Sequence, residues 1–316
     1  MNRRSFLAAA GAGLSSLEAA TAAFPVIDTH IHLFDTTRPG GVPWPPKTNA
    51  VLYKPALPPR YRKLAMPHGV VGAIEVEASP LLEDNQWVLD VCRKDTIMLG
   101  TVGDLEPDKP DFRANLDRFH KDPLFLGIRY GNLWGRDFQA AVAKPEFIAG
   151  IKDLAAAGLT LDTANPRPAL IPILLRLTEK VPDLRVVIDH LPQLNPPEEA
   201  AARREYDANL RELASTRPRV FVKLSEVLRR VDGKVIEDGA FYKPRLDELF
   251  GLFGEDRVVF GSDWPNSDNW APYDKVFRVV YEYFIAKGKP VAEKYFWKNS
   301  VAAYRWKPRH RSQPRG

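Results

Sequence analysis

The stretch Val26-Ile27-Asp28-Thr29-His30-Ile31-His32 is apolar and β-branched at its start and polar at its end, as expected of a buried β-strand. Seven similar runs follow it, each ending at a turn or polar segment, and most are followed by a helical pattern. The eight predicted strands are residues 26–32, 70–78, 97–105, 125–130, 159–164, 185–191, 220–225 and 258–263. Eight strands alternating with helices over roughly 280 residues fit a barrel better than an open doubly wound sheet. The sequence therefore predicts an α/β fold, a (β/α)8 TIM barrel, as one domain over residues 24–306.

The predicted outer helices carry single apolar stripes. Phe112, Leu116 and Phe119 are spaced at i, i+4 and i+7. A second stripe consists of Leu246, Leu249, Phe250 and Phe253, and its helix is expected to begin at Pro244, because proline suits a first helical turn. Two closing helices are predicted over residues 273–287 and 291–304.

A long connection follows the first strand, between Asp35 and Gly69. It contains seven prolines from Pro39 to Pro59, with Trp44 among them. Long loops in compact domains are usually either functional or disordered. Since this one leaves the end of a barrel strand, we expect it to cover the mouth of the barrel.

Residues 1–23 have the features of a twin-arginine export signal. Arg3 and Arg4 precede a modestly apolar, Ala/Gly-rich run and then small residues suited to cleavage. An unstructured N-terminus with chance arginines is the alternative. The mature chain is expected to begin near Phe24 and to be exported or periplasmic.

The net charge of +5 comes mainly from the two ends of the chain. Four basic residues lie in residues 307–316, which we predict to be a solvated, disordered tail, so the body is nearly neutral and no nucleic-acid partner is expected. Cys92 is the only cysteine, which excludes a disulfide within the chain. No apolar run after Phe24 reaches the roughly 18 residues that span a bilayer, so no membrane anchor is expected.

Four residues with reactive side chains fall at predicted strand ends. His30 and His32 point to one face, because side chains alternate along a strand. His190 ends the sixth predicted strand and Asp263 ends the eighth. The carboxyl ends of barrel strands form the face on which TIM-barrel enzymes build their sites. Separate core or surface roles are the alternative, but we expect all four residues to meet in one site.

Several motifs together resemble the amidohydrolase superfamily, in particular the branch of metal-dependent hydrolases related to sugar lactonases and 2-pyrone-4,6-dicarboxylate lactonase. The likeness covers nearly the whole mature chain. The motifs are Ile27-Asp28-Thr29-His30-Ile31-His32, Gly127-Ile128-Arg129, Ile188-Asp189-His190-Leu191-Pro192, Val222-Lys223-Leu224-Ser225 and Phe260-Gly261-Ser262-Asp263-Trp264-Pro265.

This resemblance implies roles for four residues. His30, His32 and His190 would bind a metal or polarise the substrate carbonyl, and Asp263 would activate water. Ester hydrolysis needs such a base and positive charge near the developing oxyanion. With an ordinary pKa of about 4, Asp263 would be ionised at neutral pH and could act as the base.

The metal content is left open between two possibilities. One is a single divalent ion, zinc or manganese, held by His30, His32 and Asp263, and the other is a metal-free site. Superfamily members with a further metal ligand carry a histidine ending strand five or a lysine ending strand four. Here those ends read Leu161-Asp162-Thr163-Ala164 and Ile128-Arg129-Tyr130, so a binuclear site is not expected.

Four residues are candidates for substrate binding. Arg129 has a planar fork suited to a carboxylate or sugar-acid oxygen, with a structural salt bridge as the alternative. Glu77 shares a strand face with Glu75 and could accept hydrogen bonds from substrate hydroxyls. Lys223 could point into the barrel or outward, and Trp264 could be a sugar-stacking wall or plain core.

We therefore expect a hydrolase that opens a small sugar-acid or carboxylated lactone by water attack. A metal-dependent decarboxylase of an aromatic or unsaturated acid and a non-catalytic ligand-binding barrel are the alternatives. Neither a phosphate-cradling glycine loop nor a Gly-x-Ser-x-Gly elbow occurs, which argues against nucleotide use and a serine esterase. The expected partner is a small-molecule substrate, and the sequence leaves the oligomeric state open.

Overall fold

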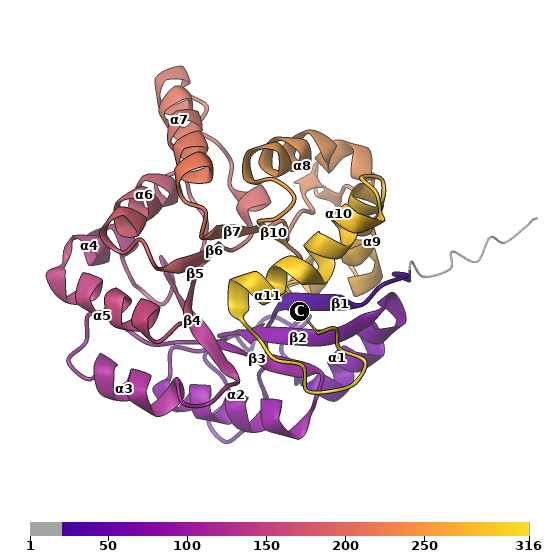
Figure 1. Ribbon diagram of the computed structural model, residues 1–316. Helices are drawn as coiled ribbons and strands as arrows, with labels where there is room; N and C mark the ends of the chain where they lie inside the picture. The colour runs from indigo at the N-terminus through magenta and orange to yellow at the C-terminus, as the bar shows by residue number, and fades with distance from the viewer. Residues whose placement is uncertain (1–20, 316) are drawn as a thin grey trace, which may run out of the picture.

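The computed structural model describes residues 21–315 and confirms the predicted TIM barrel (Figure 1). Eight parallel strands follow one another in chain order around the barrel. They are β1 Val26–Ile31, β2 Val70–Val76, β3 Met98–Gly103, β4 Phe125–Gly131, β5 Thr160–Ala164, β6 Arg185–Ile188, β7 Val220–Lys223 and β10 Val258–Val259. Main-chain hydrogen bonds from Thr29 to Phe260 (3.0 Å) and from Asp263 to His30 (2.8 Å) join the last strand to the first.

The last three barrel strands are shorter than the sequence predicts. The chain leaves the ladder after Ile188, Lys223 and Val259. Shortly afterwards it adopts positive φ at His190 (52°), Glu226 (48°) and Asp263 (59°). A left-handed conformation cannot continue a strand, so the regular ladder ends before these side chains.

Helices surround the barrel and connect its strands. They are α2 Leu82–Lys94, α3 Phe112–Phe119, α4 Phe138–Ala143, α5 Pro145–Ala156, α6 Leu170–Lys180, α7 Ala200–Thr216, α8 Gly239–Phe253 and α9 Tyr273–Ile285. The apolar stripes predicted on α3 and α8 are buried, apart from the partly buried Phe250. Helix α8 does not begin at Pro244, however, because the Asp238 side chain accepts a hydrogen bond from the main-chain N–H of Ala240 and caps the helix earlier.

The C-terminal helices close the N-terminal face of the barrel. Helix α10 (Lys289–Glu293), the π-helical turn η4 (Lys294–Lys298) and α11 (Asn299–Tyr304) follow one another, and α11, in yellow, lies across the middle of the ring of strands (Figure 1). Tyr304 and Trp306 pack with the barrel-interior residues, and the Tyr304 hydroxyl donates to Asp162 at 2.8 Å. This apolar plug forms the floor on which the polar part of the barrel interior rests.

The long connection after β1 is folded. It contains α1 (Pro58–Ala65) and the 3-10 turn η1 (Met66–His68), and Phe34 pairs with Ala56 in an antiparallel bridge. Within it, the Trp44 ring lies edge-on to His32, with ring centroids 5.3 Å apart. The connection therefore lies over the mouth of the barrel at Trp44, in agreement with the prediction.

The segment after Trp306 differs from the predicted disordered tail. Arg309 donates through Nη1 to the main-chain oxygens of Cys92 and Met98, both at 2.6 Å. Gln313 is 4% exposed and donates to the main-chain oxygens of Val71 and Thr96. Composition predicted solvation here, but these two side chains donate to main-chain oxygens of α2, β2, β3 and the turn between α2 and β3.

The predicted export signal lies mostly outside the described residues, which begin at Thr21. Near the predicted cleavage point, Ala22 is buried, and Phe24 packs its ring 5.7 Å from that of Phe296. Within residues 21–315, no helix is long and apolar enough to cross a membrane.

A β-hairpin follows β7. Its strands β8 (Arg230–Val231) and β9 (Lys234–Val235) pair in antiparallel fashion, outside the barrel sheet.

Candidate active site

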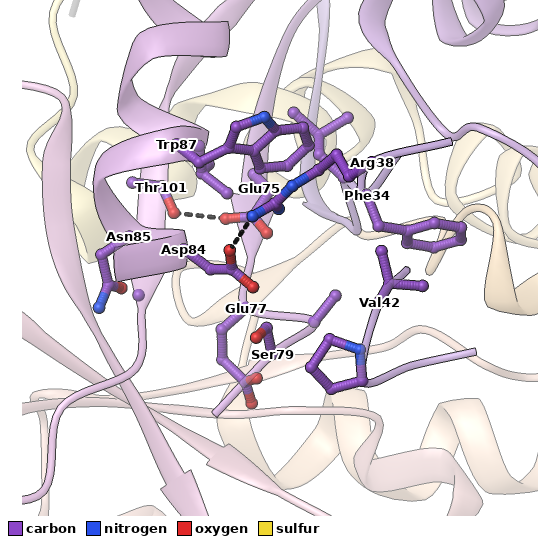
Figure 2. A pocket seen from close by; sticks show the side chains of 15 residues that line it. Phe34, Arg38, Val42, Glu75, Glu77, Ser79, Asp84, Asn85, Trp87 and Thr101 are labelled. Carbon is purple, nitrogen blue, oxygen red and sulfur yellow. Dashed lines mark hydrogen bonds and ion pairs between the residues drawn. The ribbon is translucent and has the colours of Figure 1, made fainter. Parts of the chain in front are cut away.

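Two cavities adjoin at the carboxyl end of β2, and Glu77 lines both. The first lies between β2, β3 and α2, where Thr101 donates to Glu75 and the Arg38 guanidinium lies between Asp84 and the Trp87 ring (Figure 2). Its volume of about 20 Å³ holds one water-sized molecule, which is too small for a metabolite.

The second cavity measures about 290 Å³ and lies at the mouth of the barrel. We call it the site cavity. Its walls are His32, Trp44, Glu77, Ala78, Arg129, Leu133, Trp134, Asn165, His190, Gln193, Glu226, Asp263 and Asn266. Two tryptophans among several charged and amide groups suit a small polar ligand with some apolar surface.

Unusual backbone conformations are concentrated around this cavity. Trp134, Asn165, His190, Glu226 and Asp263 all have positive φ and all line it. Each conformation costs of the order of 1 kcal/mol or more for a residue with a Cβ. The barrel therefore maintains local strain where side chains must be aimed at one point.

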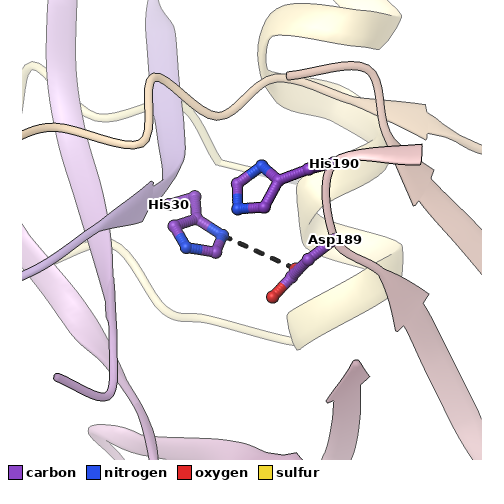
Figure 3. Close-up of side chains that lie close together, drawn as sticks. All are labelled: His30, Asp189 and His190. Atoms are coloured by element: carbon purple, nitrogen blue, oxygen red, sulfur yellow. Dashed lines mark ion pairs between the residues drawn. The ribbon is translucent and has the colours of Figure 1, made fainter. Parts of the chain in front are cut away.

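Three histidines converge on one carboxylate oxygen. From Oδ1 of Asp263, the Nε2 atoms lie at 3.1 Å for His32, 3.5 Å for His30 and 3.7 Å for His190. His30 and His190 lie beside each other, with ring centroids 4.3 Å apart, and Nδ1 of His30 faces Asp189 at 3.5 Å (Figure 3). The structure thus brings together the four residues that the sequence placed at strand ends.

The contact between His32 and Asp263 requires a shared cation or proton. Nδ1 of His32 lies 2.7 Å from the main-chain oxygen of Val76, so it donates and Nε2 carries the lone pair. Burial, with Arg129 nearby, lowers the pKa of His32 to about 4, while burial raises the pKa of Asp263 to about 6. Since two lone pairs repel, a proton or a metal ion between Nε2 and Oδ1 makes this contact favourable.

Lys223 determines the proton position on His30. Its Nζ lies 3.1 Å from Nδ1 of His30, 2.6 Å from Asp162 and 2.8 Å from Asp189. An ammonium group donates and cannot accept, so Nδ1 of His30 accepts here. Burial, together with the charge of Lys223, holds the pKa of His30 well below its usual value. The ring is therefore neutral, with its proton on Nε2.

A layer of buried charges supports the histidines from below. Lys223 links Asp162 and Asp189, and Nε of Arg129 lies 3.0 Å from Asp189. Although burial alone would raise it, these two cations hold the pKa of Asp189 below its usual range. For Asp162 burial prevails and raises the pKa to about 7.

Arg129, Glu77 and Trp134 form one wall of the site cavity. Nη1 of Arg129 lies 3.7 Å from Glu77, and the Trp134 indole N–H donates to Glu77 at 3.0 Å. Burial raises the pKa of Glu77 to about 8 against the opposing charge of Arg129. This wall offers a substrate both positive charge and a carboxyl group.

Sequence reasoning missed Glu226, which also lines the site cavity. Asn266 donates to Glu226 at 3.0 Å and to Asp263 at 2.7 Å. Burial, followed by the charge of Asp263, holds the pKa of Glu226 well above its usual value. Glu226 comes one residue after the predicted seventh strand, so extending the search past each strand end would have identified it.

Two of the predicted substrate contacts, Lys223 and Trp264, are not among the residues that line the site cavity. Lys223 does point into the barrel, but it lies below the histidines in the layer of buried charges. Trp264 is fully buried against Tyr61, with the Arg60 guanidinium over its ring, so it is core.

Glu75 and Glu77 also differ from the prediction, because Glu75 lines only the small cavity facing α2. Strand β2 ends at Val76, so the alternation of faces does not extend to Glu77.

The residues of this site fit a divalent metal ion. His30, His32 and Asp263, all buried, can each offer one ligand atom within 4.8 Å of the others, as can His190, the partly buried Glu226 and Asp263. Imidazole nitrogen with carboxylate oxygen is a donor set that zinc accepts. Nε2 of His30 is buried with no hydrogen-bond partner among the described residues, and an ion there would require the proton on Nδ1, directed at Asp189 in place of the bond from Lys223.

Comparison with known proteins gives a family match over nearly the whole described chain. The amidohydrolase family model matches residues 27–306. The L-fucono-1,5-lactonase of Burkholderia ambifaria is 29% identical over 243 residues, which cover 76% of this chain and 80% of that protein.

Two solved structures show the same fold. An amidohydrolase from Burkholderia multivorans with bound zinc has a TM-score of 0.77 and 22% identity, covering 90% of this chain and all of that one. The 5-carboxyvanillate decarboxylase of Novosphingobium aromaticivorans, complexed with manganese, has a TM-score of 0.63 and 16% identity, covering 91% and 99%.

Proposed function

The chain belongs to the amidohydrolase family, and we propose that it hydrolyses a small lactone of the sugar-acid or carboxylated type. The observation that carries this proposal is the convergence of three histidine nitrogens on Asp263, in a cavity that also presents Arg129. The lactonase relative supports a cyclic ester as the substrate class.

In the proposed reaction Asp263 acts as the general base. It takes a proton from a water molecule in the site cavity, and the resulting hydroxide attacks the lactone carbonyl. Arg129 and His190, which also line the cavity, stabilise negative charge that develops on the carbonyl oxygen. Asp263 then returns the proton to the ring oxygen as the carbon–oxygen bond breaks, which yields a hydroxy acid.

His30, His32 and Asp263 would hold one divalent ion, zinc or manganese. Such an ion supplies positive charge to a carbonyl oxygen and lowers the pKa of water. His32, which follows β1 and lines the cavity whereas His30 does not, also orients Asp263 toward the substrate.

Substrate recognition is assigned to five residues that line the site cavity. The Arg129 fork suits a carboxylate or a sugar-acid oxygen, and Glu77 and Asn165 can bond hydroxyl groups. Trp44 and Trp134 offer apolar faces for the carbon skeleton.

The test is an assay of the purified chain on sugar-acid lactones and carboxylated lactones, with acid release and bound metal recorded. We expect turnover of at least one lactone, and Asp263→Asn should lower kcat by about 10²- to 10⁴-fold. Asp268→Asn is the matched control, because Asp268 pairs with Arg60 outside the cavity and should retain activity.

The competing functions give different results in the same assay. Carbon dioxide release from an aromatic acid without lactone turnover would support the decarboxylase instead. Tight binding of a lactone with no turnover would support a non-catalytic ligand-binding barrel.

A further inference from the structure

Another hollow lies on the N-terminal face of the barrel, opposite the face that carries the site cavity. It measures about 490 Å³, and its ionisable lining residues are Lys152, Lys180, Asp183, Arg185, Arg219 and Arg305. They come from α5, from α6 and the turn after it, from the starts of β6 and β7, and from the residue after α11. Five positive side chains therefore face one carboxylate.

Few of these cations are neutralised within the described part of the chain. Arg219 pairs with Asp183 at 3.3 Å. Lys152 and Arg305 form no ion pair with any residue from 21 to 315, and Lys180 makes only a 3.4 Å contact with the main-chain oxygen of Val142. Arginines elsewhere in the fold, such as Arg62 and Arg113, each face an aspartate.

Arg185 is the most buried of the cations and has no acidic partner among residues 21–315. It is 6% exposed, and its guanidinium donates to the main-chain oxygens of Ala303 (3.1 Å) and Gly158. A Cβ on Gly158 would lie 3.6 Å from Nη1 of Arg305, so both guanidinium groups lie beside the same residue. Burial, then Arg305 and Arg219, lowers the pKa of Arg185 to about 10, as expected for neighbouring like charges.

We propose that this hollow binds a small oxyanion of the phosphate class, either free or as part of a larger molecule. Concave clusters of one charge concentrate the electric field and attract counter-ions. Guanidinium forks match the geometry of tetrahedral oxyanions, and lysines add point charges around them. The carboxyl ends of α5 and α6 provide only partial negative charge, which leaves most of the five cations without compensation.

The site is separate from the proposed lactonase centre. Its residues lie at the starts of β6 and β7, whereas His190 and Glu226 follow the ends of the same strands. Binding here therefore does not depend on the proposed reaction, and its test does not use turnover.

The experiment measures thermal unfolding of the full chain with inorganic phosphate, against sodium chloride at equal ionic strength. Phosphate should raise the melting midpoint by about 2 °C or more beyond chloride. In Lys152→Gln/Arg305→Asn this difference should vanish. Asparagine is chosen because it tolerates the positive φ of 55° at position 305.

A second readout separates binding from a merely structural role of these cations. In low salt without phosphate, the double variant should melt above the wild type, because repulsion around Arg185 is reduced. A structural role predicts a lower midpoint instead. The control Arg204→Gln/Lys243→Gln removes the same charge from α7 and α8, does not touch the hollow, and should respond to phosphate like the wild type.

Vesicles distinguish a lipid headgroup from a free ligand. Co-sedimentation with phosphatidylglycerol vesicles that phosphate reverses and the double variant loses would support the site with a membrane headgroup as its ligand. The proposal would be overturned if phosphate raised the melting midpoint equally in the wild type, the double variant and the control. It would also be overturned if the wild type showed neither a phosphate response nor vesicle binding.

Discussion

The contact between Lys223 and His30 determines which ring nitrogen of His30 carries the proton. Because Lys223 donates to Nδ1, we expect His30 to be the neutral Nε2–H tautomer in the metal-free protein at neutral pH. His32 should be the opposite tautomer, because its Nδ1 donates to Val76. Nitrogen-15 NMR of the six histidines, assigned by His30→Gln and His32→Gln variants, measures both. An Nδ1–H signal for His30 would contradict the geometry.

The individual site residues were predictable where the strand pattern extended to them. His30, His32, His190 and Asp263 each lie within the last three residues of a predicted strand, and the carboxyl-end rule placed them together. The strand pattern does not indicate how deep in the barrel a side chain lies. Lys223 could therefore not be distinguished from a residue that lines the site cavity. Its place was decided by two aspartates on other strands, Asp162 and Asp189.

Among the secondary-structure elements, the packing of β2 and β3 against α2 encloses a titratable group. Burial, together with the charge of Glu77, raises the pKa of Glu75 to about 8. Its other neighbours are Thr101 on β3, Cys92 on α2, and the Arg38–Asp84 pair that closes the cavity. The folded state therefore binds this proton more tightly than the unfolded chain does.

Linkage gives the sign of the resulting pH dependence. A carboxyl whose folded pKa is raised stabilises the fold at low pH and loses that contribution as pH rises from about 4.5 to about 8. Glu75→Gln mimics the protonated form and removes the loss. In urea unfolding, Glu75→Gln should be as stable as the wild type near pH 4.5. Near pH 8 its unfolding free energy should be higher than that of the wild type by about 2 kcal/mol or more.

The matched control for this prediction is Glu83→Gln, on the exposed face of α2. Glu83 pairs with Arg118, which lowers its pKa, so its substitution should bring no gain in stability as pH rises. A pH-independent difference between Glu75→Gln and the wild type would contradict the assigned protonation of Glu75.

The C-terminal segment stabilises the strands it crosses. Arg309 donates to the main-chain oxygens of Cys92 and Met98, and Arg309→Ala removes both hydrogen bonds, although the Asp95 N–H still donates to Cys92. The expected loss is about 1–3 kcal/mol of unfolding free energy, measured by urea denaturation. Arg311→Ala is the control, because Arg311 is exposed and should change stability by less than about 0.5 kcal/mol. Equal effects would mean that net charge, not hydrogen bonding, is responsible.

For the chain as a whole, the number and order of barrel strands followed from the sequence, whereas several strand ends did not. Eight apolar runs were enough to predict the barrel. Strands β6, β7 and β10 end early because the chain turns left-handed at His190, Glu226 and Asp263. The residue types at these positions do not predict a left-handed conformation. Similarly, charge composition could not reveal that Arg309 and Gln313 donate to main-chain carbonyls of neighbouring elements.

We also propose that the chain is exported, on the basis of Arg3, Arg4 and the small residues before Phe24. N-terminal sequencing of periplasmic protein should begin near Phe24, and Arg3→Lys/Arg4→Lys should retain the full-length chain in the cytoplasm. Arg203→Lys/Arg204→Lys on α7 makes the same change in the folded body and should leave export intact. A retained Met1 in periplasmic material would contradict a cleaved signal.

The left-handed residues around the site cavity have a consequence for the descent of this protein. Glycine adopts positive φ without the penalty that His190, Glu226 and Asp263 incur, so the mutations that disable this site through these positions also relax the local backbone. Loss of activity through such glycine substitutions would cost the folded state little stability. A lineage that ceased to need the reaction should therefore accumulate glycine at these positions early, while its barrel remained intact.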